Sequence, residues 1–214
     1  MNSYQQNWPR QEAERHGYIR TASGRKFWPL EPKIQEVQIQ DIAVSLSNTA
    51  RWGGHCKFYS VAQHAVRCAE QAIALRVPEI NPYRMLHHDD SEGYLTDLPA
   101  PIKRGIPGFK RVEDGLMTVI ALALDFAWPM THAEHDMDSG MLVAESRFLF
   151  PATTHEDFPV DPVILKFPID ERSWEPEEAR RNFLWMHDQL CGHESYVRGE
   201  PMVSVRREGA ERCA

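Results

Sequence analysis

Residues 60–75, SVAQHAVRCAEQAIAL, contain the strongest helical pattern in this chain. Apolar residues recur there at steps of three and four, the spacing of one buried helix face: Val61, Ala65, Cys68, Ala72 and Leu75. Ser60 is a typical N-cap residue and predicts where the helix begins. His64 falls on or beside the apolar stripe, so this helix carries an imidazole towards the interior.

Similar patterns extend from this segment in both directions. We expect further helices over residues 41–50, 83–94, 109–126, 132–150 and 175–190, with N-caps at Asp41, Thr131 and Ser173. Residues 18–32 predict a turn or short hairpin followed by an extended segment, and the proline-rich residues 97–107 predict a loop. The sequence therefore predicts an all-α fold, a compact helical bundle with a short non-helical N-terminal arm.

Length and composition favour one globular domain. The chain has 214 residues, of which 42% are hydrophobic and 26% charged, close to the average of folded proteins. Such a length can bury a core without disulfides or a metal. We expect a flexible N-terminus over residues 1–17, the domain over 18–192, and a charged, disordered tail over 193–214.

The charge pattern excludes several partners. A net charge of −7 leaves no electrostatic footprint for a nucleic-acid polymer, although a small phosphorylated ligand can still bind a local cluster of cations. No apolar run is long enough to span a membrane, and the N-terminal residues lack an apolar signal core. We therefore expect a cytoplasmic protein that binds no membrane. We also expect a homo-oligomer. The four cysteines form no CxxC pair, which argues against a zinc knuckle.

Histidine and carboxylate side chains concentrate in a few segments. These are Gln63-His64, the run His87-His88-Asp89-Asp90, the group His132, His135 and Asp136, and Asp138. Mixed imidazole and carboxylate donors suit one divalent transition metal, cobalt, manganese, zinc or iron, with magnesium ranked below them. A lone buried histidine is more often a core residue than a ligand. The adjacent run changes this balance, because buried polar groups without partners are costly and a shared cation would satisfy them.

Two carboxylates follow the run. Glu92 lies four residues after His88, which on a continuous helix places both on one face. A carboxylate there is suited to proton transfer or to support of the ligands, and a solvated helix face is the alternative. Asp97 precedes Leu98-Pro99 and is a second candidate.

The ordered set of motifs resembles a known superfamily. The pattern H…HD…D, made by His64, His88-Asp89 and a distal aspartate, is similar to the HD-domain metal-dependent phosphohydrolases. Arg51-Trp52, then VAQH at 61–64, then HDxxExxxxDxPxPxK from 88 to 103, resembles the 5′-deoxynucleotidases of this superfamily. The stretch DIAVSLSNTARWGGHCKFYSVAQH, residues 41–64, is also similar to phage enzymes, including dATP triphosphohydrolases. The resemblance covers roughly residues 18–190 and implies a bacterial cytoplasm, or that of a phage host.

The resemblance also implies roles. His64, His88, Asp89 and the distal aspartate would bind one metal, Glu92 and Asp97 would be catalytic, and the residues that contact the nucleotide would be Arg51 and Trp52. At position 90 relatives usually carry a small residue. The extra carboxylate of Asp90 would then either perturb metal affinity or face solvent.

The distal ligand must be chosen between Asp136 and Asp138. On a helix Asp138 shares its face with Leu142, Glu145 and Leu149, and its spacing to Glu145 resembles the last motif of the family. We therefore expect Asp138 to bind the metal. His132, His135 and Asp136 could form a second site, but exposed residues at a helix start are the favoured interpretation.

The expected reaction is hydrolysis of the 5′-phosphoester of a deoxynucleotide. Arg51 and Lys103 would bind the phosphate, Trp52 would contact the base or sugar, and His55 is a further candidate for substrate binding. The substrate would be a monophosphate or a triphosphate such as dATP. A catalytically silent nucleotide-binding or regulatory protein is the alternative. The acidic charge disfavours a nuclease, and the absence of HExxH disfavours a zinc protease.

Overall fold

The computed structural model describes residues 17–150 and 172–192. The expected flexible N-terminus, apart from Gly17, and the expected tail from 193 lie outside these residues. The described α-helices are α2 (Ile39–Asn48), α3 (Val61–Leu75), α4 (Pro82–His87), α5 (Glu92–Leu95), α6 (Ala100–Gly105), α7 (Phe109–Leu124), α8 (His132–Leu149) and α9 (Pro176–Leu190), and two short 3-10 helices are η2 (Ile34–Glu36) and η3 (Trp52–Gly54). The expected all-α class is confirmed.

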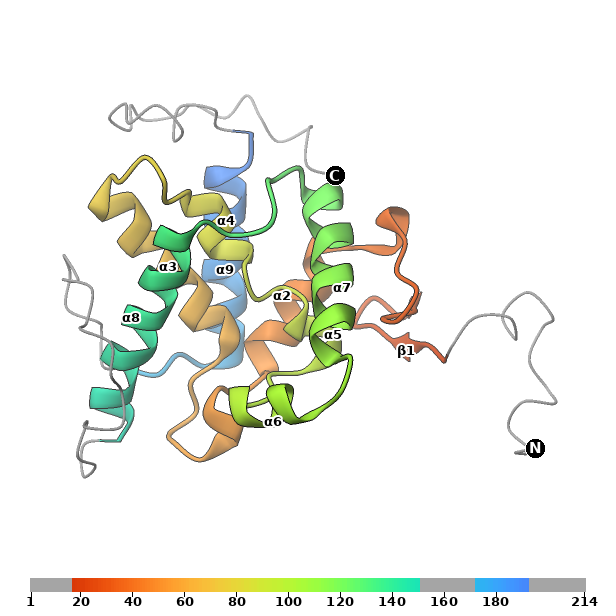
Figure 1. Ribbon diagram of the computed structural model, residues 1–214, viewed down its shortest axis with the longest axis horizontal. Helices are drawn as coiled ribbons and strands as arrows, with labels where there is room; N and C mark the ends of the chain where they lie inside the picture. Colours follow the sequence, from red (N-terminus) through yellow and green to blue (C-terminus); the bar gives the residue numbers. More distant parts are fainter. Residues whose placement is uncertain (1–16, 151–171, 193–214) are drawn as a thin grey trace, which may run out of the picture.

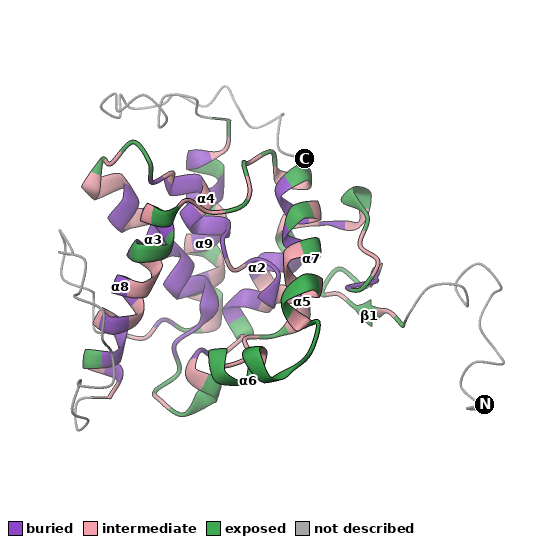
Figure 2. Ribbon diagram, in the orientation of Figure 1, coloured by how far each residue is buried: buried purple, intermediate pink, exposed green. Residues whose placement is uncertain are grey.

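Helix α3 lies at the centre of the bundle and packs against α2, α4, α8 and α9 (Figure 1). Its small residues allow this close packing, because Ala62, Ala65 and Ala69 are all fully buried. One apolar cluster joins α3 to α2, α4, α7 and α9, and a second joins the stripe of Cys68 and Ala72 to Met137 and Met141 of α8. In Figure 2 the buried residues run along α3, α4 and α9, whereas α6 is largely exposed. His64 is fully buried on α3, one turn before Cys68 of the second cluster.

Capping side chains begin two of the long helices as the sequence predicts. The hydroxyl oxygen of Ser60 accepts a hydrogen bond from the backbone N–H of Gln63 over 3.1 Å. Thr131 and Glu134 form a reciprocal capping box at the start of α8. At α9 the cap is Glu175 rather than Ser173, because Pro176 fits the first helical position.

Asp41, which the sequence predicts as a helix N-cap, instead anchors the N-terminal arm. Strands β1 (Ile19–Arg20) and β2 (Lys26–Phe27) form an antiparallel hairpin. The carboxylate of Asp41 accepts hydrogen bonds from the backbone N–H and the hydroxyl of Ser23, over 2.7 and 2.8 Å. Asp41 therefore lies inside the first turn of α2, with Gln38 as the cap, and holds the hairpin turn against that helix.

The predicted helix over 83–94 is interrupted. Helix α4 ends at His87, a turn follows, and α5 starts at Glu92. The predicted loop over 97–107 contains the short helix α6, which Pro99 and Pro101 are suited to start. The interruption redirects the chain at the two residues that resemble the HD motif. Among the described residues, no helix has the length and apolar character needed to cross a membrane.

Candidate metal centre

Three separate elements bring the candidate ligands together. His64 comes from the first turn of α3, His88 and Asp89 from the turn between α4 and α5, and Asp138 from the second turn of α8. The packing of α4 and α8 against α3 makes this convergence possible. Both imidazoles are buried, whereas the side chains of Asp89 and Asp138 keep 22% and 34% of their surface exposed. The cluster is therefore closed on the histidine side and open on the carboxylate side.

The donor atoms lie at mutual distances typical of a metal site. His64 Nε2 lies 3.3 Å from His88 Nε2, and Asp138 Oδ1 lies 3.1 Å from the first and 3.4 Å from the second. Asp89 Oδ2 lies 3.3 Å from His88 Nε2 and 3.7 Å from His64 Nε2. Bonds of about 2.0–2.1 Å around a tetrahedral zinc ion separate neighbouring donors by roughly 3.3 Å. The spacing of these donors fits a divalent ion.

The second nitrogen of each histidine already has a partner. His64 Nδ1 donates to Oε1 of Glu145 over 2.6 Å, and His88 Nδ1 donates to the backbone carbonyl of Met85 over 2.8 Å. A carbonyl oxygen can only accept, so Nδ1 of His88 carries a proton, and Nε2 is the nitrogen that faces the cluster. Hydrogen bonds of this kind orient metal-binding histidines in many proteins.

The electrostatics of the cluster also favour a cation. Burial by itself lowers the pKa of His88, but the carboxylates Asp89 and Asp138 raise it to about 10. Burial raises the pKa of Asp138, yet hydrogen bonds from both histidines hold it well below its usual value. Without an ion, protons supply the positive charge that these electron-rich groups require.

Cys68 is a donor that the sequence interpretation missed. It lies one turn after His64 on α3, and its Sγ is 3.5 Å from His64 Nε2 and 3.9 Å from Nδ1. Donor atoms of His64, Cys68, His88 and Asp138 all lie within 4.8 Å of one another. The spacing of four residues from His64 was the available signal, but the thiol fitted the apolar stripe equally well. This group could hold a metal ion.

Arg51 lies against the carboxylate side of the cluster. Its Nη1 donates to Oδ2 of Asp89 over 3.5 Å, and its Nε lies 3.3 Å from Oε2 of Glu145. Arg51 is buried, and although burial opposes the charge, Glu145 and Asp89 raise its pKa. The guanidinium is therefore a fixed positive charge beside the donors.

The residues after Arg51 form an unusual turn. Trp52 has φ 59°, a left-handed conformation that is uncommon outside glycine, and Gly53 and Gly54 also have positive φ. The Trp52 ring packs edge-on against Phe150 with centroids 5.2 Å apart. His55 follows on the exposed side of this turn. Strain of this kind often occurs at binding sites, so the turn is a candidate substrate contact.

Glu92 lies close to the cluster with one oxygen engaged. Its Oε1 accepts from Lys103 Nζ over 2.7 Å, whereas Oε2 is buried without a hydrogen-bond partner among the described residues. Burial, together with Asp89 and Asp97, raises the pKa of Glu92 to about 8. Glu92 therefore keeps its proton to a higher pH than an exposed glutamate does.

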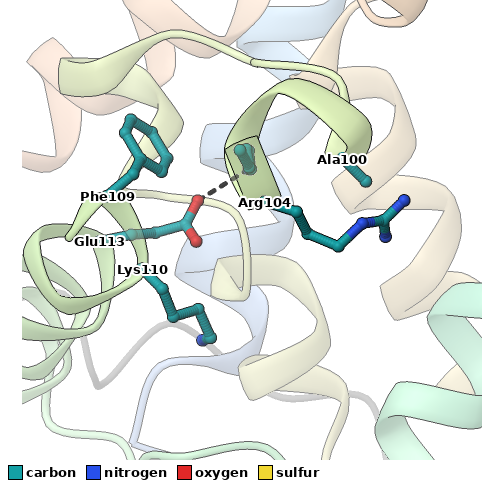
Figure 3. Close-up of a pocket in the computed structure, with 6 residues that line it drawn as sticks. Ala100, Arg104, Phe109, Lys110 and Glu113 are labelled. Atoms are coloured by element: carbon teal, nitrogen blue, oxygen red, sulfur yellow. Dashed lines mark hydrogen bonds and ion pairs between the residues drawn. The ribbon is translucent and has the colours of Figure 1, made fainter. Parts of the chain in front are cut away.

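Asp97 and Lys103 complete the surroundings. Asp97 is half-buried after Thr96, a β-branched residue at φ 69°, and burial raises its pKa. Lys103 Nζ also donates to Glu113 over 2.7 Å, so the ammonium joins two carboxylates. Glu113 and Lys103 line a cavity of about 220 Å³ between α6 and α7. Figure 3 shows Glu113 in this cavity together with Arg104 and Lys110.

The remaining histidine group lies outside the cluster. His132, His135 and Asp136 are exposed at the start of α8. Of the two aspartates considered for the distal position, Asp138 is the one that approaches both imidazoles. The helical-face argument therefore selected the aspartate that the structure brings to the donors.

The fold and the site together define a helical protein with a candidate metal centre. No family model matches the sequence. Among curated proteins, it is 40% identical to the uncharacterized protein YfdR of Escherichia coli K12 over 133 residues, 62% of this chain and 72% of YfdR. An uncharacterized protein of Rhodobacter capsulatus is 33% identical over 115 residues, 50% of this chain and 58% of that protein. The chain belongs to the YfdR family.

Proposed function

We propose that this protein is a metal-dependent phosphohydrolase of the HD-domain type that hydrolyses the 5′-phosphoester of deoxynucleotides. One observation carries the proposal: two oriented imidazole nitrogens and two carboxylates converge near the buried carboxyl group of Glu92, whose pKa burial raises. A metal centre next to a proton donor is suited to phosphoester hydrolysis.

The residues that would hold the ion are His64, His88, Asp138 and Asp89, with Cys68 as a further donor. When bound, a divalent ion supplies Lewis acidity, which withdraws electrons from a phosphoryl oxygen and makes a nearby water more acidic. The exposed surfaces of Asp89 and Asp138 leave a side on which a phosphate can approach.

The proton of Glu92 gives this residue a specific role. The leaving 5′ oxygen of the nucleoside must gain a proton as its bond to phosphorus breaks, and a carboxyl group of pKa about 8 holds one at neutral pH. Lys103 fixes the carboxyl group by its hydrogen bond to Oε1. Asp97, which is more exposed, orients the attacking water.

Arg51 and Trp52 form the substrate side of the proposal. The guanidinium already faces Asp89, so a phosphate oxygen near the ligands would meet a positive charge that needs no rearrangement. Trp52 offers a flat surface to the base or sugar. Arg104 and Lys110, exposed beside Lys103, could bind further phosphates, and we therefore rank monophosphates and triphosphates equally.

The decisive experiment is product analysis with a panel of nucleotides. Deoxy- and ribonucleoside monophosphates and triphosphates are incubated with protein loaded with manganese, cobalt, zinc, iron or magnesium. Inorganic phosphate from monophosphates identifies a 5′-nucleotidase, and intact triphosphate identifies a triphosphohydrolase. Release of neither product with any ion overturns the proposal.

A matched variant separates catalysis from a contaminating phosphatase. Glu92→Gln keeps the shape of the side chain but cannot donate a carboxyl proton, so we expect turnover to fall while metal content stays unchanged. A deoxynucleotide substrate is also consistent with the expected cytoplasmic location, and the expected homo-oligomer stays a prediction.

A further inference from the structure

Behind the candidate ligands, the same turn carries a second polar pair that points the other way. His87 and Asp90 flank His88 and Asp89 in sequence, and both have no exposed surface. Oδ2 of Asp90 lies 2.7 Å from Nδ1 of His87. From the sequence, the carboxylate of Asp90 would either perturb metal affinity or face solvent. The burial of Asp90 excludes the solvated side chain.

The pair continues into helix α9. His87 Nε2 lies 3.0 Å from Nδ1 of His187, and the two rings are nearly perpendicular with centroids 5.1 Å apart. The hydroxyl of Tyr83 lies 3.3 Å from the same nitrogen of His187 and donates to the carbonyl of Leu124 over 3.2 Å. One line of hydrogen bonds therefore joins α9 to the ligand-bearing turn.

Stability alone does not account for this arrangement. Oδ1 of Asp90 and Nε2 of His187 are buried without hydrogen-bond partners among the described residues. Such atoms cost free energy, and apolar residues of similar volume often stabilise a core as well or better. A role in fixing the geometry of the turn would account for keeping these buried polar residues.

We propose that Asp90, His87 and His187 are positioning residues that hold His88 and Asp89 in place from behind the turn. The proposal rests on the metal centre described above. The side-chain bond from His87 to Asp90 spans the two ligand positions. The backbone N–H of Asp90 also donates to the carbonyl of His87 over 3.3 Å. His187, on α9, fixes the plane of the His87 ring, so the hydrogen-bonded pair of His87 and Asp90 cannot rotate freely.

The test measures metal affinity of the full chain by competition with a chromophoric chelator. Partners that orient metal ligands typically contribute about 10–100-fold to affinity, so we expect Asp90→Ala to weaken binding of cobalt and zinc by roughly that factor. Asp90→Asn retains an oxygen that accepts from His87, and we expect it to restore most of the affinity.

A second variant distinguishes a direct effect on metal affinity from a loss of folding stability. His87→Leu combined with Asp90→Ala replaces the pair by apolar groups and is expected to keep the melting temperature near or above that of the wild type. Under the proposal its metal affinity stays low. As a further control, Leu190→Ala destabilises the core of α9 and is expected to leave metal affinity unchanged.

The outcomes are distinct. Wild-type affinity in Asp90→Ala, or in the double variant, overturns the positioning role. A loss of affinity that follows the melting temperature through Leu190→Ala also overturns it. If the wild-type protein binds the ions but hydrolyses no nucleotide, the proposed function fails while the positioning role is still decided by the affinities.

Discussion

Nδ1 of His64 lies 2.6 Å from Oε1 of Glu145, and neither side chain has any exposed surface. The other oxygen of Glu145 lies 3.3 Å from Nε of Arg51. One buried carboxylate therefore joins a candidate metal ligand to a candidate substrate residue. Burial raises the pKa of Glu145, but His64 and Arg51 together hold it below its usual value, so the carboxylate stays charged.

We expect Glu145→Gln to affect both partners. The amide can still accept from His64 but carries no charge, so metal affinity should fall by about 10–100-fold and KM should rise as Arg51 loses its ion pair. Chelator competition and steady-state kinetics measure the two effects. Glu177→Gln, on the exposed surface of α9, is the control. Unchanged metal affinity in Glu145→Gln would show that this carboxylate only supports Arg51.

The choice of distal ligand is tested by a pair of neighbouring variants. Asp138→Ala removes an oxygen within 3.4 Å of both imidazoles, whereas Asp136→Ala removes an exposed carboxylate from the same helix. We expect the first to lose metal and the stabilisation by added metal, which is about 2.7 kcal/mol at a hundredfold excess over Kd. Metal analysis and thermal unfolding with and without chelator give the readout. Full metal occupancy in Asp138→Ala would contradict the assignment.

Variants of Glu92 and Asp97, unlike variants of the ligands, should lose activity but keep the metal. A general acid or base contributes roughly 10²–10⁴-fold to turnover, so Glu92→Gln should lose activity by that factor and keep its metal. Asp97→Asn should lose less, because Asp97 is more exposed and, in the proposed mechanism, only orients the water. Single-turnover kinetics with metal analysis distinguish the cases. Loss of the ion from Glu92→Gln would make Glu92 a ligand instead.

The thiol of Cys68 beside the other donors leads to a prediction about which metal binds. Thiolate ligands favour zinc and cobalt over manganese and magnesium. We therefore expect Cys68→Ser to lower zinc and cobalt affinity more than manganese affinity, and to remove the near-ultraviolet thiolate band of the cobalt-loaded protein. Cys56→Ser, at a half-buried free thiol, is the control. A cobalt spectrum that is the same in Cys68→Ser and wild type would place the thiol outside the coordination sphere.

His187 predicts a pH dependence of stability. Burial and the neighbouring His87 lower its pKa to about 3, below the value of about 6.5 in an unfolded chain. The unfolded state therefore binds one more proton between these values, and the free energy of unfolding falls as pH falls through this range. The limiting slope for one group is about 1.4 kcal/mol per pH unit.

The variant His187→Gln removes this titration. Chemical denaturation of chelated protein between about pH 6 and 4 should give a slope shallower than that of the wild type by up to about 1.4 kcal/mol per pH unit. Other groups titrate in both proteins and cancel in the comparison. Equal slopes would show that His187 is already protonated in the folded state.

Local sequence determined where most of the helices lie and how they begin. The apolar stripe after Ser60, the capping box at Thr131 and the proline at the start of α9 depend on neighbours within about one helical turn, so their pattern can be read directly. The donor types are given by the residues themselves. The preference for Asp138 over Asp136 followed from helical periodicity together with the resemblance of the Asp138–Glu145 spacing to a family motif. The all-α class followed from these elements together.

Tertiary packing decided the rest. The interruption after His87 places His88 and Asp89 on one side of a turn and His87 and Asp90 on the other, an outcome that depends on α3, α8 and α9 packing around it. Glu145 reaches His64 because α8 packs against α3. Cys68 lies one turn from His64 on α3, but only the convergence of the other donors shows that its thiol belongs to the cluster. Periodicity records which residues share a helix face. Which residue of another helix meets that face is set by the closest packing of the whole core.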